Sequence, residues 1–112
     1  MKEKKLYNKT SKSPVGTSLQ QYVNVTYNKL ENLFGEPNAE SDGYKVSIEW
    51  NLEDNKGRVL TIYDYKETSL YDSTYPTPEE FLLSIKETPY SWHIGAGDQE
   101  SAEALKNYIE NN

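Results

Sequence analysis

Alternating apolar and polar positions predict a β-sheet. The most regular alternation runs over residues 44–53, and a second one covers residues 19–25. A period of two residues is typical of strands that are buried on one face. Residues 58–66 hold strong strand formers, and residues 90–94 are long enough for a last short strand. We therefore expect four strands.

Helical signals lie between these strands. Residues 27–34 place apolar side chains on one face after Thr26, a residue type that caps helix starts. Residues 78–85 follow Thr77, and the glutamate three positions after this threonine completes a capping box. A third apolar stripe follows Asp98, which can cap a final helix. The predicted order is β-α-β-β-α-β-α, an α+β fold with a small, mostly antiparallel sheet and helices packed on one face.

Two pairings are open for the predicted hairpin of residues 44–53 and 58–66. If residues 54–57 form the loop, Ile48 lies opposite Tyr63. A slip of one residue exchanges the two faces of the second strand. In either pairing both faces of that strand carry apolar or aromatic side chains, as in a central strand or one covered by another subunit. We therefore expect a homo-oligomer.

The chain is predicted to divide into a tail and one domain. Residues 1–14 are polar and lysine-rich without a period, which is typical of a disordered basic tail. Residues 15–112 have the usual size of a single α+β domain. No apolar run in the chain indicates a signal peptide or a membrane span.

The charge distribution bears on the choice of partners. The net charge is −6, and the first twelve residues hold five lysines and one glutamate, so the remainder carries about −10. An acidic body repels polyanions at long range, so we expect no direct binding of DNA or RNA. The chain has no cysteine, which is consistent with a reducing cytoplasm. Its ten tyrosines indicate a recognition surface, because tyrosine combines a large ring with one polar atom.

Catalytic and metal-binding patterns are scarce. His93 is the only histidine. A metal site built from several histidines therefore cannot form, and neither can a catalytic site that pairs a nucleophile with one histidine and uses a second histidine as well. The ring is either structural or a ligand contact. Paired carboxylates such as Glu79-Glu80 belong to helix starts and helix surfaces. The sequence therefore predicts a binding protein, not an enzyme, with no cofactor and no metal.

Two segments could bind a nucleotide. Ile94–Gly97 before a helix has the form of an anion nest, but Asp98 would repel a phosphate there, and an ordinary strand-to-helix turn is the alternative. Aromatic rings and lysines could stack on bases and neutralise phosphates, although a packed aromatic core would use the same rings. The residues in question are Lys45, Trp50, Tyr63, Tyr65, Lys66 and Trp92.

An ordered set of short motifs from about Gly16 to Gly97 resembles a family of small phage proteins. The motifs are Gly16-Thr17-Ser18-Leu19-Gln20-Gln21-Tyr22, Phe34-Gly35-Glu36-Pro37, Lys45 with Glu49-Trp50, Thr61-Ile62-Tyr63-Asp64-Tyr65-Lys66 and Trp92-His93-Ile94-Gly95. The chain is similar to the viral sponge proteins that sequester the cyclic nucleotide signals of CBASS antiphage defence. It departs from that pattern after Ile94, where Gly95-Ala96 replaces a pair of glycines.

The resemblance implies a homo-oligomer in the cytoplasm of the infected bacterium that holds a cyclic dinucleotide such as cGAMP without cleaving it. A site for this ligand needs rings for the bases, cations for the phosphates and amides for the base edges. The residues expected to form it are Thr17, Gln20, Gln21, Lys45, Tyr65, Lys66, Trp92 and His93.

Two other functions remain open from the sequence. The acidic body could act as a DNA mimic that inhibits a host defence or repair enzyme, in which case carboxylates should form paired rows on one surface. A small hydrolase of signalling nucleotides is less consistent with the sequence, because one histidine and no evident nucleophile leave little to activate water.

Overall fold

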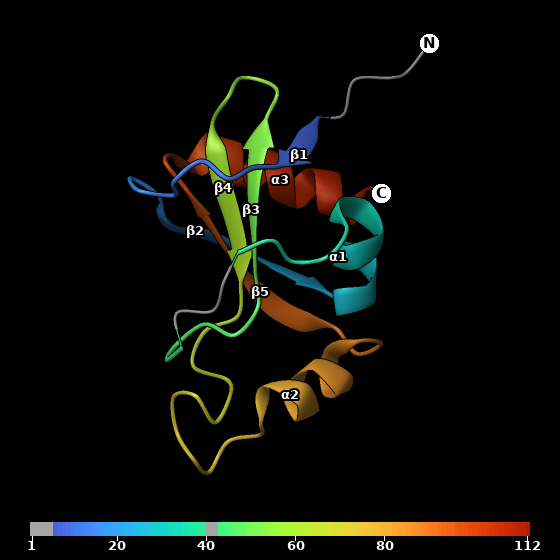
Figure 1. The fold of residues 1–112 in the computed structure, drawn as a ribbon. Coiled ribbons are helices and arrows are strands. Elements are labelled where there is room, and N and C mark those ends of the chain that lie inside the picture. The colour runs from blue at the N-terminus through green and yellow to red at the C-terminus, as the bar shows by residue number, and fades with distance from the viewer. Residues whose placement is uncertain (1–5, 40–42) are drawn as a thin grey trace.

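The computed structural model describes residues 6–39 and 43–112. Within these ranges the chain forms one five-stranded antiparallel sheet and three α-helices (Figure 1), which confirms the predicted α+β class. The elements in chain order are β1 Tyr7–Lys9, β2 Ser18–Val25, α1 Tyr27–Phe34, β3 Glu49–Asp54, β4 Val59–Tyr63, α2 Pro78–Ile85, β5 Tyr90–Ala96 and α3 Gln99–Glu110. The strand order across the sheet is β1-β3-β4-β5-β2.

The predicted disordered tail is wrong for residues 7–9, which form β1 along the edge of β3. The ring of Tyr7 anchors this short strand, with its centroid 5.0 Å from the ring of Tyr108 and 6.4 Å from that of Phe34. A strand of three residues is too short to show an alternating pattern in the sequence. It is held in place by a tertiary contact, which the sequence alone does not reveal. Residues 1–5 of the predicted tail lie outside the described residues.

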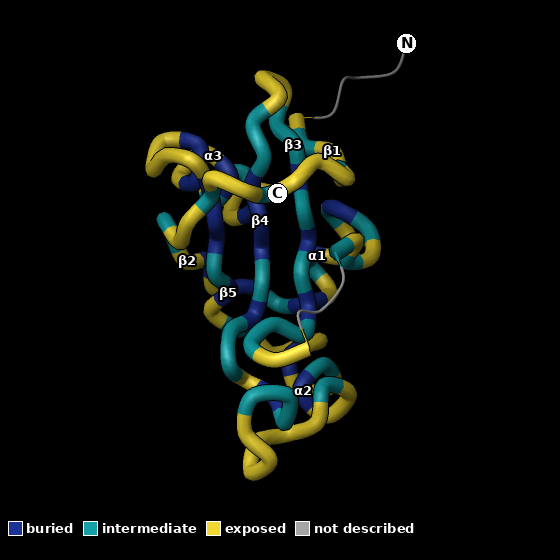
Figure 2. The backbone as a smooth tube through the Cα atoms, turned by 60° about the vertical axis from the view of Figure 1, so that its left-hand side comes forward, coloured by how far each residue is buried: buried dark blue, intermediate teal, exposed yellow. Residues whose placement is uncertain are grey.

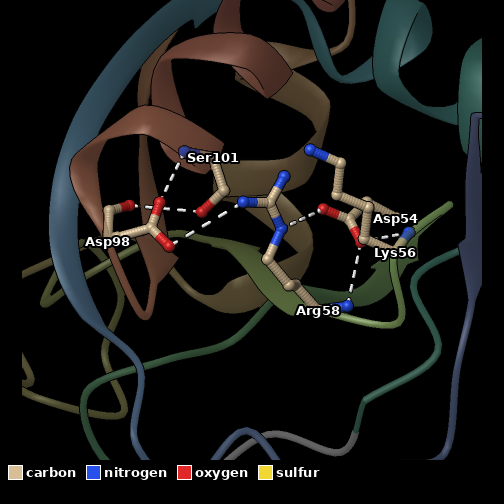
Figure 3. Close-up of polar contacts among 5 residues, drawn as sticks. All are labelled: Asp54, Lys56, Arg58, Asp98 and Ser101. Atoms are coloured by element: carbon tan, nitrogen blue, oxygen red, sulfur yellow. Dashed lines mark hydrogen bonds and ion pairs between the residues drawn. The ribbon is translucent and has the colours of Figure 1, made fainter.

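Of the two predicted pairings, the β3–β4 hairpin does not adopt the one that places Ile48 opposite Tyr63. It adopts the pairing that is shifted by one residue. Glu49 lies opposite Tyr63 instead, and the N–H of Asp54 donates to the carbonyl of Arg58 at 3.0 Å. The loop is therefore residues 55–57. The Asp54 carboxylate accepts hydrogen bonds from the backbone N–H groups of Lys56 and Arg58, both at 2.9 Å (Figure 3), and so stabilises the short turn.

This register places four fully buried side chains on one face of the hairpin, where they join the core. They are Trp50, Leu52, Leu60 and Ile62. Both tryptophans of the chain lie in this core, and each indole N–H finds a backbone carbonyl: Trp50 donates to Gly35 at 2.8 Å and Trp92 donates to Val25 at 2.9 Å. Burial is concentrated in the middle of the sheet strands, whereas the hairpin tip and the loop before α2 are exposed (Figure 2).

The helices begin and end largely where their capping residues predict. Thr26 and Thr77 cap α1 and α2, and Thr77 forms the complete capping box with Glu80. Asp98 caps α3, which packs on β2 and β5 over the core face, while α2 lies beyond one end of the sheet (Figure 1). None of the helices in the described ranges is long and apolar enough to span a membrane.

The segment between β1 and β2 crosses the other face of the sheet. Residues 10–17, here called the crossover segment, pass in front of β3 and β4 in Figure 1. Thr10 donates its N–H to the carbonyl of Asn51 at 3.0 Å, and the Lys12 ammonium lies 2.8 Å from the carboxylate of Glu53. These contacts fix the segment against the sheet before the chain enters β2.

Candidate functional site

The face of the sheet opposite the core, here called the open face, carries two rows of side chains that run across the strands. The register places each row on neighbouring residues of β3, β4, β5 and β2. The first row is Glu49, Tyr63, His93 and Tyr22, and the second is Asn51, Thr61, Gly95 and Leu19. Because side chains in a row are direct neighbours, this face brings together residues from distant parts of the sequence.

His93 lies at the centre of a group of tyrosine rings. Its ring centroid is 4.9 Å from that of Tyr22, 5.3 Å from that of Tyr63 and 5.5 Å from that of Tyr65. The rings of Tyr63 and His93 are stacked, with 28° between their planes. The structure thus brings the predicted site residues Tyr65 and His93 together. Tyr22 was not predicted, although its pairing with His93 follows once β2 and β5 are neighbours.

Two buried polar atoms on the open face have no hydrogen-bond partner among the described residues. They are Nδ1 of His93 and Oδ1 of Asn51, one in each row. Burial lowers the pKa of His93, which favours the neutral form of its ring. Buried polar groups are rarely left unpaired, and an unpaired one indicates a water, an ion or a ligand. Both atoms therefore mark this face as a place where a polar ligand could bind.

A hollow of about 290 Å³ lies between the crossover segment and the two rows. The sheet contributes Glu49, Thr61, Tyr63 and Gly95, and the chain from Pro14 to Ser18 contributes the opposite wall. We call it the face hollow. It is large enough for one nucleobase, and it combines a ring with several hydrogen-bonding groups.

Gly95 shapes this hollow. A Cβ on residue 95 would lie 2.5 Å from the Thr61 hydroxyl oxygen and 3.5 Å from the Tyr63 ring. Any larger residue would therefore displace a neighbour or fill the space. The predicted strand end at residue 94 is two residues short, because Gly95 and Ala96 pair with Leu19 and Ser18.

Lys66 lies next to the tyrosine group in an unusual backbone conformation. Its φ angle is 58°, in the left-handed region, and its N–H donates to the carbonyl of Lys45 at 2.6 Å. Its ammonium lies 5.1 Å from the ring centre of Tyr65 and 4.9 Å from that of Tyr71. Lys66 and the backbone of Lys45 therefore lie at the same end of the open face as Tyr65. Strained residues of this kind cluster at functional sites.

Asp64 fixes this end of the site, and sequence reasoning missed it. Its fully buried carboxylate accepts hydrogen bonds from the N–H of Ser47 at 2.8 Å, the N–H of Ile48 at 2.7 Å and the hydroxyl of Ser47 at 2.5 Å. Burial raises the pKa of Asp64 despite these bonds. The signals in the sequence were an acidic residue among strong strand formers and its place in the motif from Thr61 to Lys66. Its carboxylate ties the end of β4 to the segment before β3.

Trp92 does not belong to the site, which corrects the sequence-based prediction. Its side chain is 0% exposed on the core face, where its ring contacts those of Trp50 and Tyr90. Trp92 and His93 are consecutive in β5, so the strand directs them to opposite faces. A ligand could reach the indole only by opening the core.

The remaining predicted residues are divided between the hollow and other surroundings. Thr17 lines the face hollow and donates its hydroxyl to the carbonyl of Pro14 at 2.7 Å. Gln20 lies at a bulge in β2 and donates its side-chain amide to the hydroxyl of Ser18 at 2.9 Å. Gln21 pairs with the buried Ile94, so it shares the core side of the sheet, not the side of His93.

The predicted anion nest before α3 is an ordinary capped turn. Asp98 accepts a hydrogen bond from the N–H of Ser101 at 2.7 Å, so a carboxylate already occupies the helix start (Figure 3). Arg58 lies beside it in a second hollow of about 260 Å³ and contacts two carboxylates, Asp54 at 2.7 Å and Asp98 at 3.9 Å. These carboxylates make this hollow unfavourable for a phosphate.

Comparisons with known proteins do not identify a family for this chain. No model of a protein family matches the chain, and no curated sequence matches it significantly. Within residues 6–39 and 43–112, no three histidine, aspartate or glutamate side chains are grouped as a metal ion would require.

Proposed function

We propose that this protein binds and sequesters a cyclic nucleotide immune signal, such as a cyclic dinucleotide, on its open face without cleaving it. The observation that carries this proposal is the His93 ring, surrounded by three tyrosine rings on the open face, with a buried Nδ1 atom that lacks a partner among the described residues. In this function the protein is a phage counter-defence protein in the cytoplasm of the infected bacterium.

The chemistry of the open face supports a nucleotide ligand. Tyr63, His93 and Tyr65 supply flat rings that can stack on bases, an interaction worth about 1–3 kcal/mol per base. Lys66 supplies a cation beside Tyr65 for a phosphate. The face hollow supplies hydroxyl and carboxylate groups that can read a base edge. The resemblance of the sequence motifs to the sponge family supports the same class of ligand.

Binding without turnover is supported by the surroundings of His93. Three aromatic rings flank this histidine, and the nearby Asp64 carboxylate is committed to three hydrogen bonds from Ser47 and Ile48. A general base for hydrolysis would need a clear path to a water molecule and a group that orients it.

The proposal includes a homo-oligomer, for which the edge of the sheet offers a contact. β2 is an edge strand of eight residues, and among the described elements it pairs only with β5. Its exposed Tyr22 and Leu19 lie on the open face. A long edge strand is a template for pairing with a second chain. Light scattering after size-exclusion chromatography would measure the number of subunits.

Calorimetry with a panel of cyclic di- and trinucleotides tests the proposed function. We expect at least one member to bind, and heating of the complex should release the ligand intact. His93→Leu should weaken binding at least about tenfold, because a stacking ring and a ring nitrogen are lost. Tyr75→Leu, a change at an exposed tyrosine of the loop before α2, is the matched control. Absence of binding by every member, or release of a cleaved product, would overturn the proposal.

The acidic inhibitor is the second candidate function. Two cations of the described surface are paired with carboxylates: Lys12 with Glu53, and Arg58 with Asp54 and Asp98. These pairs leave the excess of acidic residues to dominate the surface. An inhibitor of this kind should bind a basic host protein with an affinity that falls as salt rises, and it should ignore nucleotides.

A further inference from the structure

Residues 14–17 form a tight turn on the wall of the face hollow that lies opposite the sheet, here called the wall turn. The backbone N–H of Thr17 donates to the carbonyl of Pro14 at 3.0 Å, and the Thr17 hydroxyl donates to the same oxygen at 2.7 Å. Gly16 has a φ angle of 93°, as the third residue of a type II turn requires. The hydrogen bonds that the structure describes for residues 13–17 all lie within this stretch. The wall turn therefore keeps its shape through its own bonds.

The wall turn has open space on two sides. Val15 and Thr17 line the face hollow, and they also line the hollow of about 260 Å³ beside Arg58. A Cβ added to Gly16 would meet nothing within 4 Å. Val15 is 90% exposed, more than any other large apolar residue in the described ranges. The centre of the turn is thus unpacked.

Both ends of the wall turn are anchored, so its centre stays beside the face hollow. Before the turn, the Lys12 ammonium lies 2.8 Å from the Glu53 carboxylate. After the turn, β2 begins at Ser18, which pairs with Ala96 of β5. A segment with fixed ends and an unpacked centre is of low local stability and can move while its ends stay in place. The wall turn can therefore approach the sheet when a ligand fills the hollow.

The apolar residues of the wall turn favour the flat face of a base over a phosphate. Pro14 and Val15 offer no side-chain hydrogen bond, whereas a phosphate needs cations or donors in place of its water. The Tyr63 ring lines the sheet side of the same hollow. A base between the two walls would contact a ring on one face and an aliphatic side chain on the other. Val15 gains most from this contact, because nearly all of its surface is in water without a ligand.

Resting on the proposed function, we propose that the wall turn closes on one base of the bound cyclic dinucleotide, with Val15 as the residue that contacts this base. Closure buries the Val15 side chain and removes one face of the base from water. Thr17 then acts by shaping the turn, because its hydroxyl proton is committed to the Pro14 carbonyl.

A single cysteine at residue 15 tests this inference, because the natural chain has no cysteine. Val15→Cys keeps a small side chain, and its rate of reaction with iodoacetamide, a neutral thiol reagent, reports the exposure of residue 15. A saturating amount of each cyclic dinucleotide that binds in calorimetry should slow this reaction at least about tenfold, since only the open turn reacts. Leu83→Cys is the matched control, because residue 83 is 69% exposed on α2, and its reaction rate should be the same with and without ligand.

Affinity provides a second measurement. Val15→Ser should weaken binding at least about fivefold, while Val15→Ile and the control Leu83→Ser should bind as the wild-type protein does. The midpoint of thermal unfolding of Val15→Ser should not change, because residue 15 is exposed without ligand. Unchanged reactivity of residue 15 in the complex, or full affinity of Val15→Ser, would overturn the closure of the wall turn and leave the proposed function standing. Failure of every cyclic nucleotide to bind the wild-type protein would instead overturn the proposed function, and this inference with it.

Discussion

Gly95 and Thr61 lie directly opposite one another in the β4–β5 pair, and the Thr61 hydroxyl oxygen occupies space that a side chain on residue 95 would need. The distance from that oxygen to an ideal Cβ on residue 95 is 2.5 Å. The backbone of Gly95 is not in the left-handed region, so the requirement for glycine is one of space alone. The depth of the face hollow depends on this pair.

Gly95→Ala should therefore lower the free energy of unfolding by about 1–3 kcal/mol, since overpacking displaces Thr61. It should also weaken ligand binding by narrowing the face hollow. Urea denaturation and calorimetry measure the two effects. Gly97→Ala is the control, because a Cβ on Gly97 would meet nothing within 4 Å. Adding Thr61→Ala to Gly95→Ala should recover part of the loss, and a strictly additive double variant would contradict the steric explanation.

Trp92→Phe tests the assignment of this residue to the core. The substitution removes the hydrogen bond to the Val25 carbonyl and leaves a buried acceptor unpaired, at a cost of about 1–3 kcal/mol in unfolding free energy. Ligand affinity should stay within about twofold of the wild-type value. In the unliganded protein, acrylamide should quench the tryptophan fluorescence weakly, because both indoles are fully buried. Strong quenching that a ligand suppresses would instead place Trp92 in the binding site.

Asp64 should give stability an unusual dependence on pH. Burial raises the pKa of its carboxyl above the ordinary value of 3.8, so the folded state binds this proton more tightly than the unfolded state does. The contribution of Asp64 to the unfolding free energy therefore falls as pH rises from about 4 through the folded pKa, and it is constant above that pKa.

Asp64→Asn removes this titration while keeping an oxygen that accepts from the backbone N–H groups of Ser47 and Ile48. Urea titrations at a series of pH values measure the unfolding free energy of both proteins. The wild-type value minus the variant value should decrease as pH rises from about 4 through the folded pKa of Asp64. An increase would contradict the direction of the shift. Asp64→Ala leaves both N–H groups unpaired and should cost at least about 2 kcal/mol at every pH.

Lys66→Gly should separate binding from stability. Glycine tolerates the left-handed backbone, which relieves about 1–3 kcal/mol of strain. The loss of two cation–π contacts and the greater freedom of glycine in the unfolded chain offset this gain, so the unfolding free energy should change by less than about 1 kcal/mol. Affinity for a cyclic dinucleotide should fall at least about tenfold. Lys66→Arg should retain binding. If both variants bind as tightly as the wild-type protein, Lys66 is excluded as a phosphate contact.

The helices could be predicted from the sequence because their signals are local. Thr26 and Thr77 fix the starts of α1 and α2, and both helices have the expected bounds. The hairpin register could not be predicted in the same way, because it depends on whether Asp54 belongs to the loop or to the strand. β1 depends on contacts made by Tyr7 with residues far along the chain.

The site could be predicted in part. Tyr65 and Lys66 lie close to His93 as expected, although His93 comes from a different segment. The inclusion of Trp92 beside His93 conflicts with the alternation of the strand that carries both, so the sequence already contained the reason against it. Asn51 and Thr61 were missed because their importance arises only from pairing across strands, which a single sequence does not reveal.

The anchoring of β1 bears on how the protein can be shortened. A truncation that starts at residue 15, as the lysine-rich composition would suggest, removes the partner of Leu52–Asp54 and the ion pair that holds Lys12 on Glu53. The backbone of β3 would then be open to pairing with other molecules. Such a shortened protein should aggregate more readily than the intact chain, and the wall of the face hollow opposite the sheet would lose its anchor.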